Sequence, residues 1–380
     1  QILGFDITAS SYIGIALAFS STIIAMKLLS DKRQLDSLYS KISIGVLIIQ
    51  DLVAILILII ISSLSNKVDL GGFAIRSILN GGGLIVILFL LGFFVLPKIT
   101  NHMAKSQEIL FLFSICWCFG IAAIFNYFGF SIEIGALLAG IALSISPYSV
   151  EIAARVRPLR DFFLIIFFII LGLKIPIQGI SSIITTAVIL SLIALIFKPL
   201  ILMALSALYG YSKRTNFLVG ATLGQISEFS LIVVALGAVY GHISSEVVSI
   251  IVLTLVLTII LSTYMIMFSN SFYDFLSPIL GIFERKKVKM EKRKIKKYYD
   301  AVLFGYNRIG FSILKSFKNM KKQYVVVDFN PDVINDLKKF DIPSLYGDVY
   351  DTDFLDEMPL EKINLAVSTV PDYETNVLLI

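Results

Sequence analysis

The chain has 380 residues, of which 57% are hydrophobic and only 16% are charged, and its mean hydropathy is +0.88. This composition excludes an ordinary soluble domain of the same length, so we predict that most of the chain lies in a lipid bilayer. The formal net charge of +5 comes largely from the run ERKKVKMEKRKIKK at residues 284–297. Because that run follows an apolar segment, we interpret it as a juxtamembrane linker and expect no nucleic-acid binding.

The charged residues divide the chain into three parts. Apolar runs fill residues 1–283, the basic linker occupies residues 284–297, and residues 298–380 have the composition of a soluble domain. Residue 1 is a glutamine directly before an apolar segment, and residue 380 ends the apolar run VLLI. We therefore expect both ends of this sequence to lie inside a longer protein.

Nine segments within residues 1–283 are apolar enough to cross a membrane, which takes about 20 residues per helix. Their centres lie near Ala18, Ile55, Leu88, Cys116, Leu138, Phe167, Ile193, Val233 and Val256. If the basic linker is cytoplasmic, alternate loops are cytoplasmic too, and these loops carry Lys32, Arg33, Lys41, Lys98, Lys105, Arg155, Arg157, Arg160, Lys213 and Arg214. The opposite loops carry only Lys67, Arg76 and Lys174. This asymmetry predicts that residue 1 lies outside the plasma membrane and that residues 298–380 are cytoplasmic.

An acid stands in the second apolar segment, where Gln50 and Asp51 interrupt the run VLIIQDLVAILILII. An ionisable side chain inside a span costs at least a few kcal/mol, so it is a candidate for an ion pathway. Burial raises the pKa of a carboxyl group towards neutrality, where a proton and a cation can compete for it. The alternative is a protonated Asp51 that only bonds to a helix neighbour.

Two further spans are interrupted by polar residues. Ser20, Ser21 and Thr22 follow one another in the middle of the first span, and Gln225 and Glu228 lie in the glycine-containing run GATLGQISEF. Interrupted segments in corresponding halves of a transporter indicate an inverted repeat with the substrate site between them. The alternative for the three hydroxyls is ordinary bonding to carbonyls of their own helix.

Lys198 lies in the apolar run LIALIFKPLILM. A buried lysine either pairs with an acid or titrates. The alternative is a side chain that extends to the membrane surface, which a central position in the span disfavours.

Residues 298–380 open with a strand, a glycine turn, a helix and a second strand, the order of a dinucleotide-binding unit. Asp328 ends the second strand, where an acid binds the ribose hydroxyls, and Asp348 follows the third strand. In the turn, asparagine replaces the middle glycine of G-x-G-x-x-G, and the candidate cofactor-binding residues are Gly305, Asn307, Arg308, Ile309 and Gly310. The alternative is a Rossmann-like fold that binds nothing.

The motifs FSSTIIAM, IIQDLVAI, GALLAGIALS, FFIILGLKI, LGQISEF and GYNRIG, taken in order, resemble the monovalent cation:proton antiporter-2 family. The resemblance is to its Kef-type, glutathione-regulated potassium-efflux branch with a C-terminal RCK (TrkA-N-type) domain. It implies a membrane all-α fold, a sodium/proton-antiporter-like inverted-repeat helical bundle with two broken crossing helices, followed by a cytoplasmic α/β Rossmann-like domain.

The resemblance also implies roles for individual residues. Asp51 matches the ion- and proton-binding acid, with Gln50 and Thr22 as further ligands of the transient monovalent cation. Gln50 takes the place of a second acid in electrogenic relatives, which implies electroneutral exchange. Lys198 matches the basic residue of the family's tenth helix. The crossing broken helices contain Ser20, Ser21, Thr22, Gln225 and Glu228.

We therefore expect a secondary transporter, not an enzyme, that exchanges K+ or Na+ for protons and is gated by NAD(H) or an AMP-type adenine nucleotide, as a homodimer. A nucleotide-gated potassium channel is the alternative, but the sequence has no TVGYG-like filter. A membrane-tethered dehydrogenase is disfavoured because the only histidines, His102 and His242, lie near predicted membrane loops.

Overall fold

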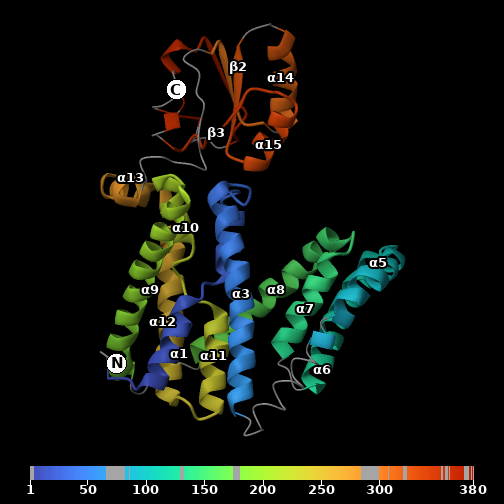
Figure 1. Cartoon of the computed structure of the whole chain (residues 1–380), viewed down its shortest axis with the longest axis vertical. Helices are drawn as coiled ribbons and strands as arrows, with labels where there is room; N and C mark the ends of the chain where they lie inside the picture. The colour runs from blue at the N-terminus through green and yellow to red at the C-terminus, as the bar shows by residue number, and fades with distance from the viewer. Residues whose placement is uncertain are drawn as a thin grey trace. The chain divides into compact units, whose positions relative to one another are not determined.

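The structure is a computed structural model of the whole chain (Figure 1). It describes residues 4–65, 82–84, 86–128, 132–173, 180–283, 299–306, 308–319, 323–351, 354–355, 358, 360–371, 376–377 and 379. The chain forms two compact units. The first unit comprises Gln1–Ile13, Asp51–Ile184 and Leu231–Val252, and the second comprises Gly14–Gln50, Thr185–Ser230 and Leu253–Ile380.

Helices dominate the part of the chain before the basic linker. In order they are α1 (Ile7–Ala18), α2 (Thr22–Asp31), α3 (Leu38–Ser65), the π-helical turn η1 (Leu91–Val95), α5 (Leu96–Met103), α6 (Gln107–Tyr127), α7 (Ile132–Ser144), α8 (Ser149–Leu173), α9 (Ile180–Tyr209), α10 (Lys213–Thr222), α11 (Glu228–Val239), α12 (Ser245–Met267), α13 (Ser269–Leu280) and η2 (Gly281–Phe283).

Length and composition identify membrane spans among these helices. Six described stretches are long and apolar enough to cross a bilayer: Ile7–Asp31, Leu38–Leu58, Gly82–Met103, Gln107–Tyr127, Ile183–Tyr209 and Ser245–Met267. Gly135–Ser144 and Glu228–Val239 are shorter apolar helices. Every predicted span centre falls in a described helix, but the count of nine spans stays a prediction.

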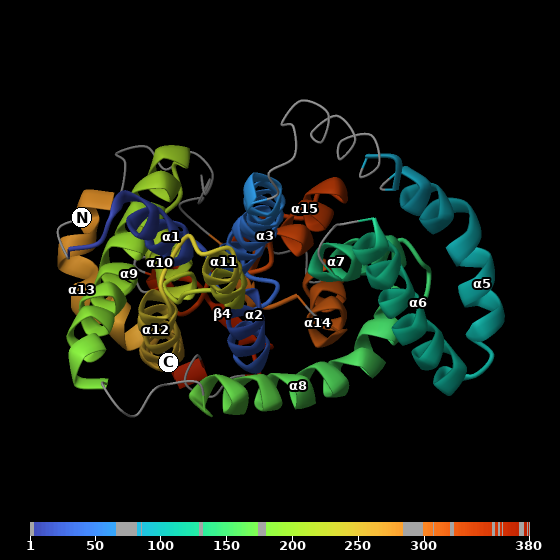
Figure 2. The same cartoon turned by 90° about the horizontal axis from the view of Figure 1, so that it is seen from below.

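In the first unit, α6 and α7 lie side by side (Figure 2). Their contact depends on Gly135, because a Cβ atom there would lie 2.7 Å from Ala122 Cα. Small residues let membrane helices approach closely, so this glycine fixes the α6–α7 packing. The surrounding apolar cluster also includes Ile121, Phe125 and Ala139.

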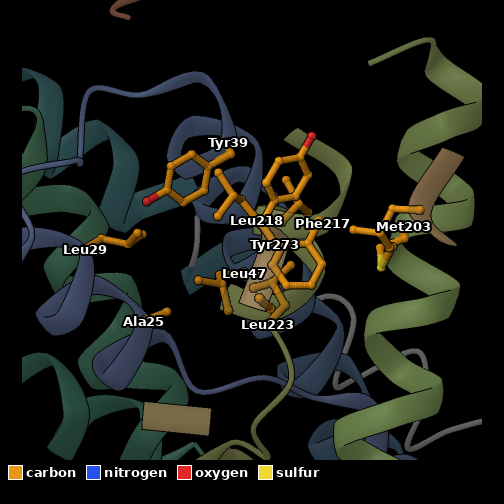
Figure 3. Packing of buried hydrophobic residues seen from close by; sticks show 12 residues of the cluster. Ala25, Leu29, Tyr39, Leu47, Met203, Phe217, Leu218, Leu223 and Tyr273 are labelled. Carbon is orange, nitrogen blue, oxygen red and sulfur yellow. The ribbon is translucent and has the colours of Figure 1, made fainter. Parts of the chain in front are cut away.

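In the second unit, α2, α3, α9, α10 and α13 share an apolar cluster (Figure 3). Phe217 of α10 and Tyr273 of α13 pack with their ring centroids 5.9 Å apart. Leu29 and Leu47 are fully buried in the same cluster. This packing fixes α10 against α13 and against the helices that carry the polar interruptions.

Both interruptions predicted from the sequence are breaks in the structure. Residues 19–21 separate α1 from α2, and residues 223–227 separate α10 from α11. Ser21 begins α2 as its N-cap and accepts a hydrogen bond from the Ile24 amide at 3.3 Å. The hydroxyl run therefore ends one helix and starts the next, as expected for a capping residue.

Residues after the linker form a parallel four-stranded sheet of order β3-β2-β1-β4. Its elements are β1 (Ala301–Phe304), α14 (Arg308–Asn319), β2 (Tyr324–Asp328), α15 (Pro331–Lys339), β3 (Ser344–Tyr346), η3 (Leu360–Lys362) and β4 (Leu365–Ser368). Helices α14 and α15 lie on the same side of the sheet (Figure 1). Their Leu314 and Leu337 side chains belong to one buried apolar cluster with the strands. The strand order reverses between β1 and β4, so the ligand crevice expected of this fold lies at their carboxyl ends.

Candidate functional site

The break between α1 and α2 is closed by the side chain of Gln50. Its Oε1 accepts the Ser20 amide at 3.0 Å, and its Nε2 donates to the Ala18 carbonyl at 3.4 Å. A helix end leaves backbone donors and acceptors without partners inside the helix. Gln50 supplies one of each, which a carboxylate cannot do because it only accepts.

The break between α10 and α11 is tied to the first break by side chains from both. Ser20 Oγ donates to the Leu223 carbonyl at 2.9 Å, and Gln225 Nε2 donates to the Ser21 carbonyl at 3.3 Å. Ser230 Oγ donates to the carbonyl of Ala16 at 2.6 Å. Residues more than 200 positions apart in sequence therefore meet at one crossing, which we call the broken-helix crossing.

Lys198 of α9 joins both breaks. Its Nζ donates to the Phe19 carbonyl at 2.7 Å and to the Gln225 carbonyl at 2.8 Å. Hydrogen bonds from a charged donor are stronger than neutral ones, and the ammonium offsets the partial negative charge of two helix ends. The sequence suggested an acidic partner or titration for Lys198; the structure gives its Nζ two backbone carbonyls as partners, and its titration stays a prediction.

Two glycines, Gly220 in α10 and Gly224 in the second break, allow close packing on α9 and α12. A Cβ atom on Gly220 would lie 2.9 Å from the Pro199 carbonyl oxygen, and one on Gly224 would lie 3.0 Å from Met265 Cε. Thr258 of α12 accepts the Ile226 amide at 3.3 Å. The second break is thus held from α9 and α12 as well as from the first break.

Gln225 has a buried amide oxygen available at the crossing. The residue is fully buried, and within the described part of the structure Gln225 Oε1 accepts no hydrogen bond. An unsatisfied buried polar atom costs about 1–3 kcal/mol, so it is expected to bind a ligand or water. An amide oxygen is also a suitable ligand for a hard cation.

Two other predicted residues lie next to the breaks in sequence. Thr22 is the first residue of α2, and Glu228 is the first residue of α11. An acid at a helix N-terminus is favoured by the helix dipole. Asp51 follows Gln50 in α3 and is half-buried. Its part in cation binding remains a prediction.

The turn after β1 requires both of its glycines. Gly305 has φ of +87°, and a Cβ atom there would lie 2.7 Å from Thr369 Oγ1. A Cβ atom on Gly310 would lie 2.5 Å from the Gly305 carbonyl oxygen. Arg308 begins α14, the Ile309 side chain is exposed, and Asn307 lies outside the described residues. Both glycines are therefore required by contacts within the turn, and the close approach of a phosphate to its backbone stays a prediction.

Asp328 lies at the end of β2 and orders the same turn. Its Oδ2 accepts the Tyr306 amide at 2.7 Å, and its Oδ1 accepts the Asn330 amide at 2.8 Å. Burial raises the pKa of the Asp328 carboxyl, and these backbone hydrogen bonds oppose the rise. Each oxygen keeps a further lone pair, so the acid is still able to accept a ribose hydroxyl.

Thr369 is a turn residue that the sequence reading missed. It follows β4, and its hydroxyl donates to the Gly305 carbonyl at 2.9 Å. Its amide donates to the Phe304 carbonyl at 2.9 Å. The sequence signal for Thr369 was its place directly after the fourth strand, β4, which lies beside β1. Residues at that place lie at the strand-order switch, where ligands bind in this fold.

Asp348 has a partner that the sequence did not suggest. Its Oδ2 accepts a hydrogen bond from Arg214 Nη2 of α10 at 3.1 Å, and its Oδ1 accepts the Tyr350 amide at 3.1 Å. The Arg214 side chain is 5% exposed and the Asp348 side chain 27%. This pair therefore lies largely out of solvent.

Comparison with known proteins matches both parts of the chain. Residues 1–268 match the transmembrane sodium/hydrogen exchanger family, and residues 301–380 match the TrkA-N domain. Proteins named glutathione-regulated potassium-efflux system protein KefC, from Shigella flexneri serotype 5b, Shigella sonnei and Escherichia coli O139:H28, are each 26% identical over 388 residues. The alignment covers all of this chain and 60% of each relative.

Proposed function

Because the chain belongs to the transmembrane sodium/hydrogen exchanger family, as a Kef-type member with a C-terminal TrkA-N domain, we propose that its protein exchanges a monovalent cation, K+ or Na+, for protons across the plasma membrane. The observation that carries the proposal is the broken-helix crossing. There, two breaks in apolar helices are joined by Lys198, Ser20 and Gln225. Unwound backbone and helix ends at mid-span supply the ion sites of secondary transporters.

Exchange would proceed by competition for one carboxylate. Asp51 is the proposed site that takes up a proton from one side and releases it when a cation arrives. Gln225 Oε1, Thr22 and Gln50 are proposed to complete the oxygen ligands of the cation. Since Gln50 is neutral, one positive charge leaves the site for each one that enters, and exchange is electroneutral.

Potassium is the favoured substrate, since the printed names of the relatives describe potassium efflux. Sodium remains the alternative that the assay must test, because ion choice depends on the geometry of the ligand shell.

The domain after the linker is proposed to bind an adenine nucleotide, NAD(H) or an AMP-type ligand, and to regulate the exchange. Support comes from the glycine turn, from Asp328 beside it, and from the match to the TrkA-N domain. The full-length protein is proposed to act as a homodimer in which each copy carries one transport site.

The test is proton movement in proteoliposomes of the full-length protein, followed with an internal pH dye after separate pulses of K+ and Na+ at a clamped potential. We expect a cation-driven pH change that Asp51→Asn abolishes and Asp31→Asn, an exposed acid that pairs with Lys27, leaves intact. Undiminished exchange in Asp51→Asn would refute the assignment. Cation flux without proton movement would instead favour a channel.

A further inference from the structure

Two ion pairs join the TrkA-N domain to the ends of two membrane helices within the second compact unit. Lys41 of α3 pairs with Asp332 of α15, and Arg214 of α10 pairs with Asp348 after β3. We call these the α3 contact and the α10 contact. Both basic residues belong to loops predicted to be cytoplasmic, on the same side as the domain they contact.

The α10 contact is built around a buried cation. Arg214 Nη2 also donates to Asn270 Oδ1 of α13 at 3.1 Å, and its guanidinium lies 5.4 Å from the centre of the Tyr273 ring. A buried charge is strongly destabilising when its partner is removed. The pairing with Asp348 therefore matters more for Arg214 than an exposed surface ion pair would.

The α3 contact continues a hydrogen-bond chain that starts at the glycine turn. Asp328 accepts the Tyr306 amide of the turn and the Asn330 amide. Asn330 Oδ1 accepts the Asp332 amide at 3.0 Å, as the N-cap of α15, and also accepts Lys41 Nζ at 3.0 Å. The proposed ribose acid and α3 are thus separated by a single residue, Asn330.

Each contacted helix leads to the broken-helix crossing. Gln50 lies nine residues after Lys41 in α3, and Leu223 lies nine residues after Arg214, just beyond α10. At 1.5 Å per residue, each distance is about 13 Å along a rigid element. A shift of α3 therefore moves Gln50, which accepts a hydrogen bond from the Ser20 amide in the first break. A shift of α10 moves Leu223, whose carbonyl accepts a hydrogen bond from Ser20 Oγ.

We propose that the α3 and α10 contacts couple the nucleotide crevice of the TrkA-N domain directly to the broken-helix crossing. This inference rests on the proposed function. A nucleotide hydroxyl that donates to Asp328 or Asp348 shares the carboxylate oxygens that accept the Asn330 amide and Arg214 Nη2, and weakens those hydrogen bonds. Binding therefore changes the strength of both contacts and biases the positions of α3 and α10. The basic linker at residues 284–297 is not required to carry the signal.

The test uses charge reversal at the α3 contact, because neither Lys41 nor Asp332 is placed in the transport or nucleotide site. Lys41→Glu, Asp332→Lys and the double variant are made in the full-length protein, and exchange is measured in proteoliposomes with and without AMP or NADH. The matched control is Lys339→Glu with Asp336→Lys, an exposed pair within α15. Nucleotide binding is measured by calorimetry on each variant.

We expect each single variant to lose most of the nucleotide effect on exchange, a change of about fivefold or more. The nucleotide affinity of each single variant should stay within about twofold of the wild-type value. The double variant, whose charges are again opposite, should recover the nucleotide effect on exchange. Arg214→Met should uncouple in the same way without a rescuing partner. Single variants that respond to nucleotide like the wild type would overturn the proposal.

A cross-linking measurement keeps the inference separate from the proposed function. Lys41→Cys with Asp332→Cys, in a protein whose other cysteines are replaced by serine, should react with a short bis-maleimide to give one intramolecular cross-link. The pair Lys339→Cys with Lys41→Cys is the control. Absence of the first cross-link would refute the α3 contact even if exchange is observed. Its presence in a protein that shows no exchange would refute the proposed function alone.

Discussion

The broken helices of the membrane part and the β1–α14 turn of the TrkA-N domain both interrupt regular structure, but they pair their backbone groups differently. At the crossing the partners are side chains from distant segments, such as Gln50 and Lys198. At the turn they come from the neighbouring strands of one sheet, through Asp328 at the end of β2 and Thr369 after β4, and two glycines allow the tight backbone path. In lipid no water replaces a missing partner, so an interruption there needs dedicated polar side chains.

The largest effect is expected at Lys198, because one ammonium serves both breaks. Lys198→Met removes two charge-assisted hydrogen bonds and leaves the Phe19 and Gln225 carbonyls with one partner fewer, each at a cost of about 1–3 kcal/mol. We expect a clear fall in melting temperature and loss of exchange. Lys98→Met, an exposed lysine of α5, is the control. A stable, active Lys198→Met protein would show that the crossing does not depend on this residue.

The next largest effect is expected at Gly310 in the turn. The Cβ atom of Gly310→Ala would meet the Gly305 carbonyl oxygen at 2.5 Å, a contact with backbone that only a shift of the turn relieves. We expect AMP or NADH to lose its stabilising effect in a thermal-shift assay. Gly281→Ala, whose Cβ meets no atom within 4 Å, should behave like the wild type. Retained stabilisation in Gly310→Ala would argue against nucleotide binding at this turn.

An intermediate effect is expected at Gln50. Gln50→Glu keeps the acceptor for the Ser20 amide but replaces the donor to the Ala18 carbonyl by a second oxygen, which costs about 1–3 kcal/mol if it is not relieved. We expect lower stability and a transport rate that becomes sensitive to membrane potential. Gln323→Glu, at an exposed position, is the control. Unchanged electroneutral exchange would contradict the role given to the Gln50 amide.

How far the sequence alone predicted this arrangement differs between the two regions. The breaks were predictable, because Ser20–Thr22 and Gln225–Glu228 put polar groups into otherwise apolar runs. The turn was predictable from its glycines and from Asp328. The partners at the crossing were not, because Ser20 meets Leu223 only through tertiary packing.

Two residues show what local patterns leave out. The carbonyl partners of Lys198 carry no side-chain signature, so the sequence suggested an acid instead. Arg214 counted only as a charge in a cytoplasmic loop, whereas its burial beside Asp348 depends on the fold of both parts of the second unit.

The smallest effect is a pH dependence at Lys32, which lies beside the α10 contact. Lys32 Nζ donates to the Ile266 carbonyl at 2.9 Å and to Ser269 Oγ at 2.8 Å. Burial lowers the pKa of Lys32 to about 8, and the nearby positive charge of Arg214 adds to this effect. The negative charge of Asp348 acts in the opposite direction. Between about pH 8 and the ordinary lysine range, the unfolded chain holds more protons than the folded one, so stability rises with pH. Melting curves of Lys32→Met should lack this rise, and an identical pH profile would contradict the assignment.

The central claim is that a cation and a proton compete for Asp51, and proton release on cation binding tests it most directly. Purified full-length protein in weak buffer is titrated with KCl and with NaCl while a pH indicator is read, and choline chloride is the control. The account predicts that the number of protons released per bound cation rises towards about one as pH falls and the Asp51 carboxyl becomes protonated. It predicts no release from Asp51→Asn. Cation binding without proton release, or equal release from Asp51→Asn, would contradict it.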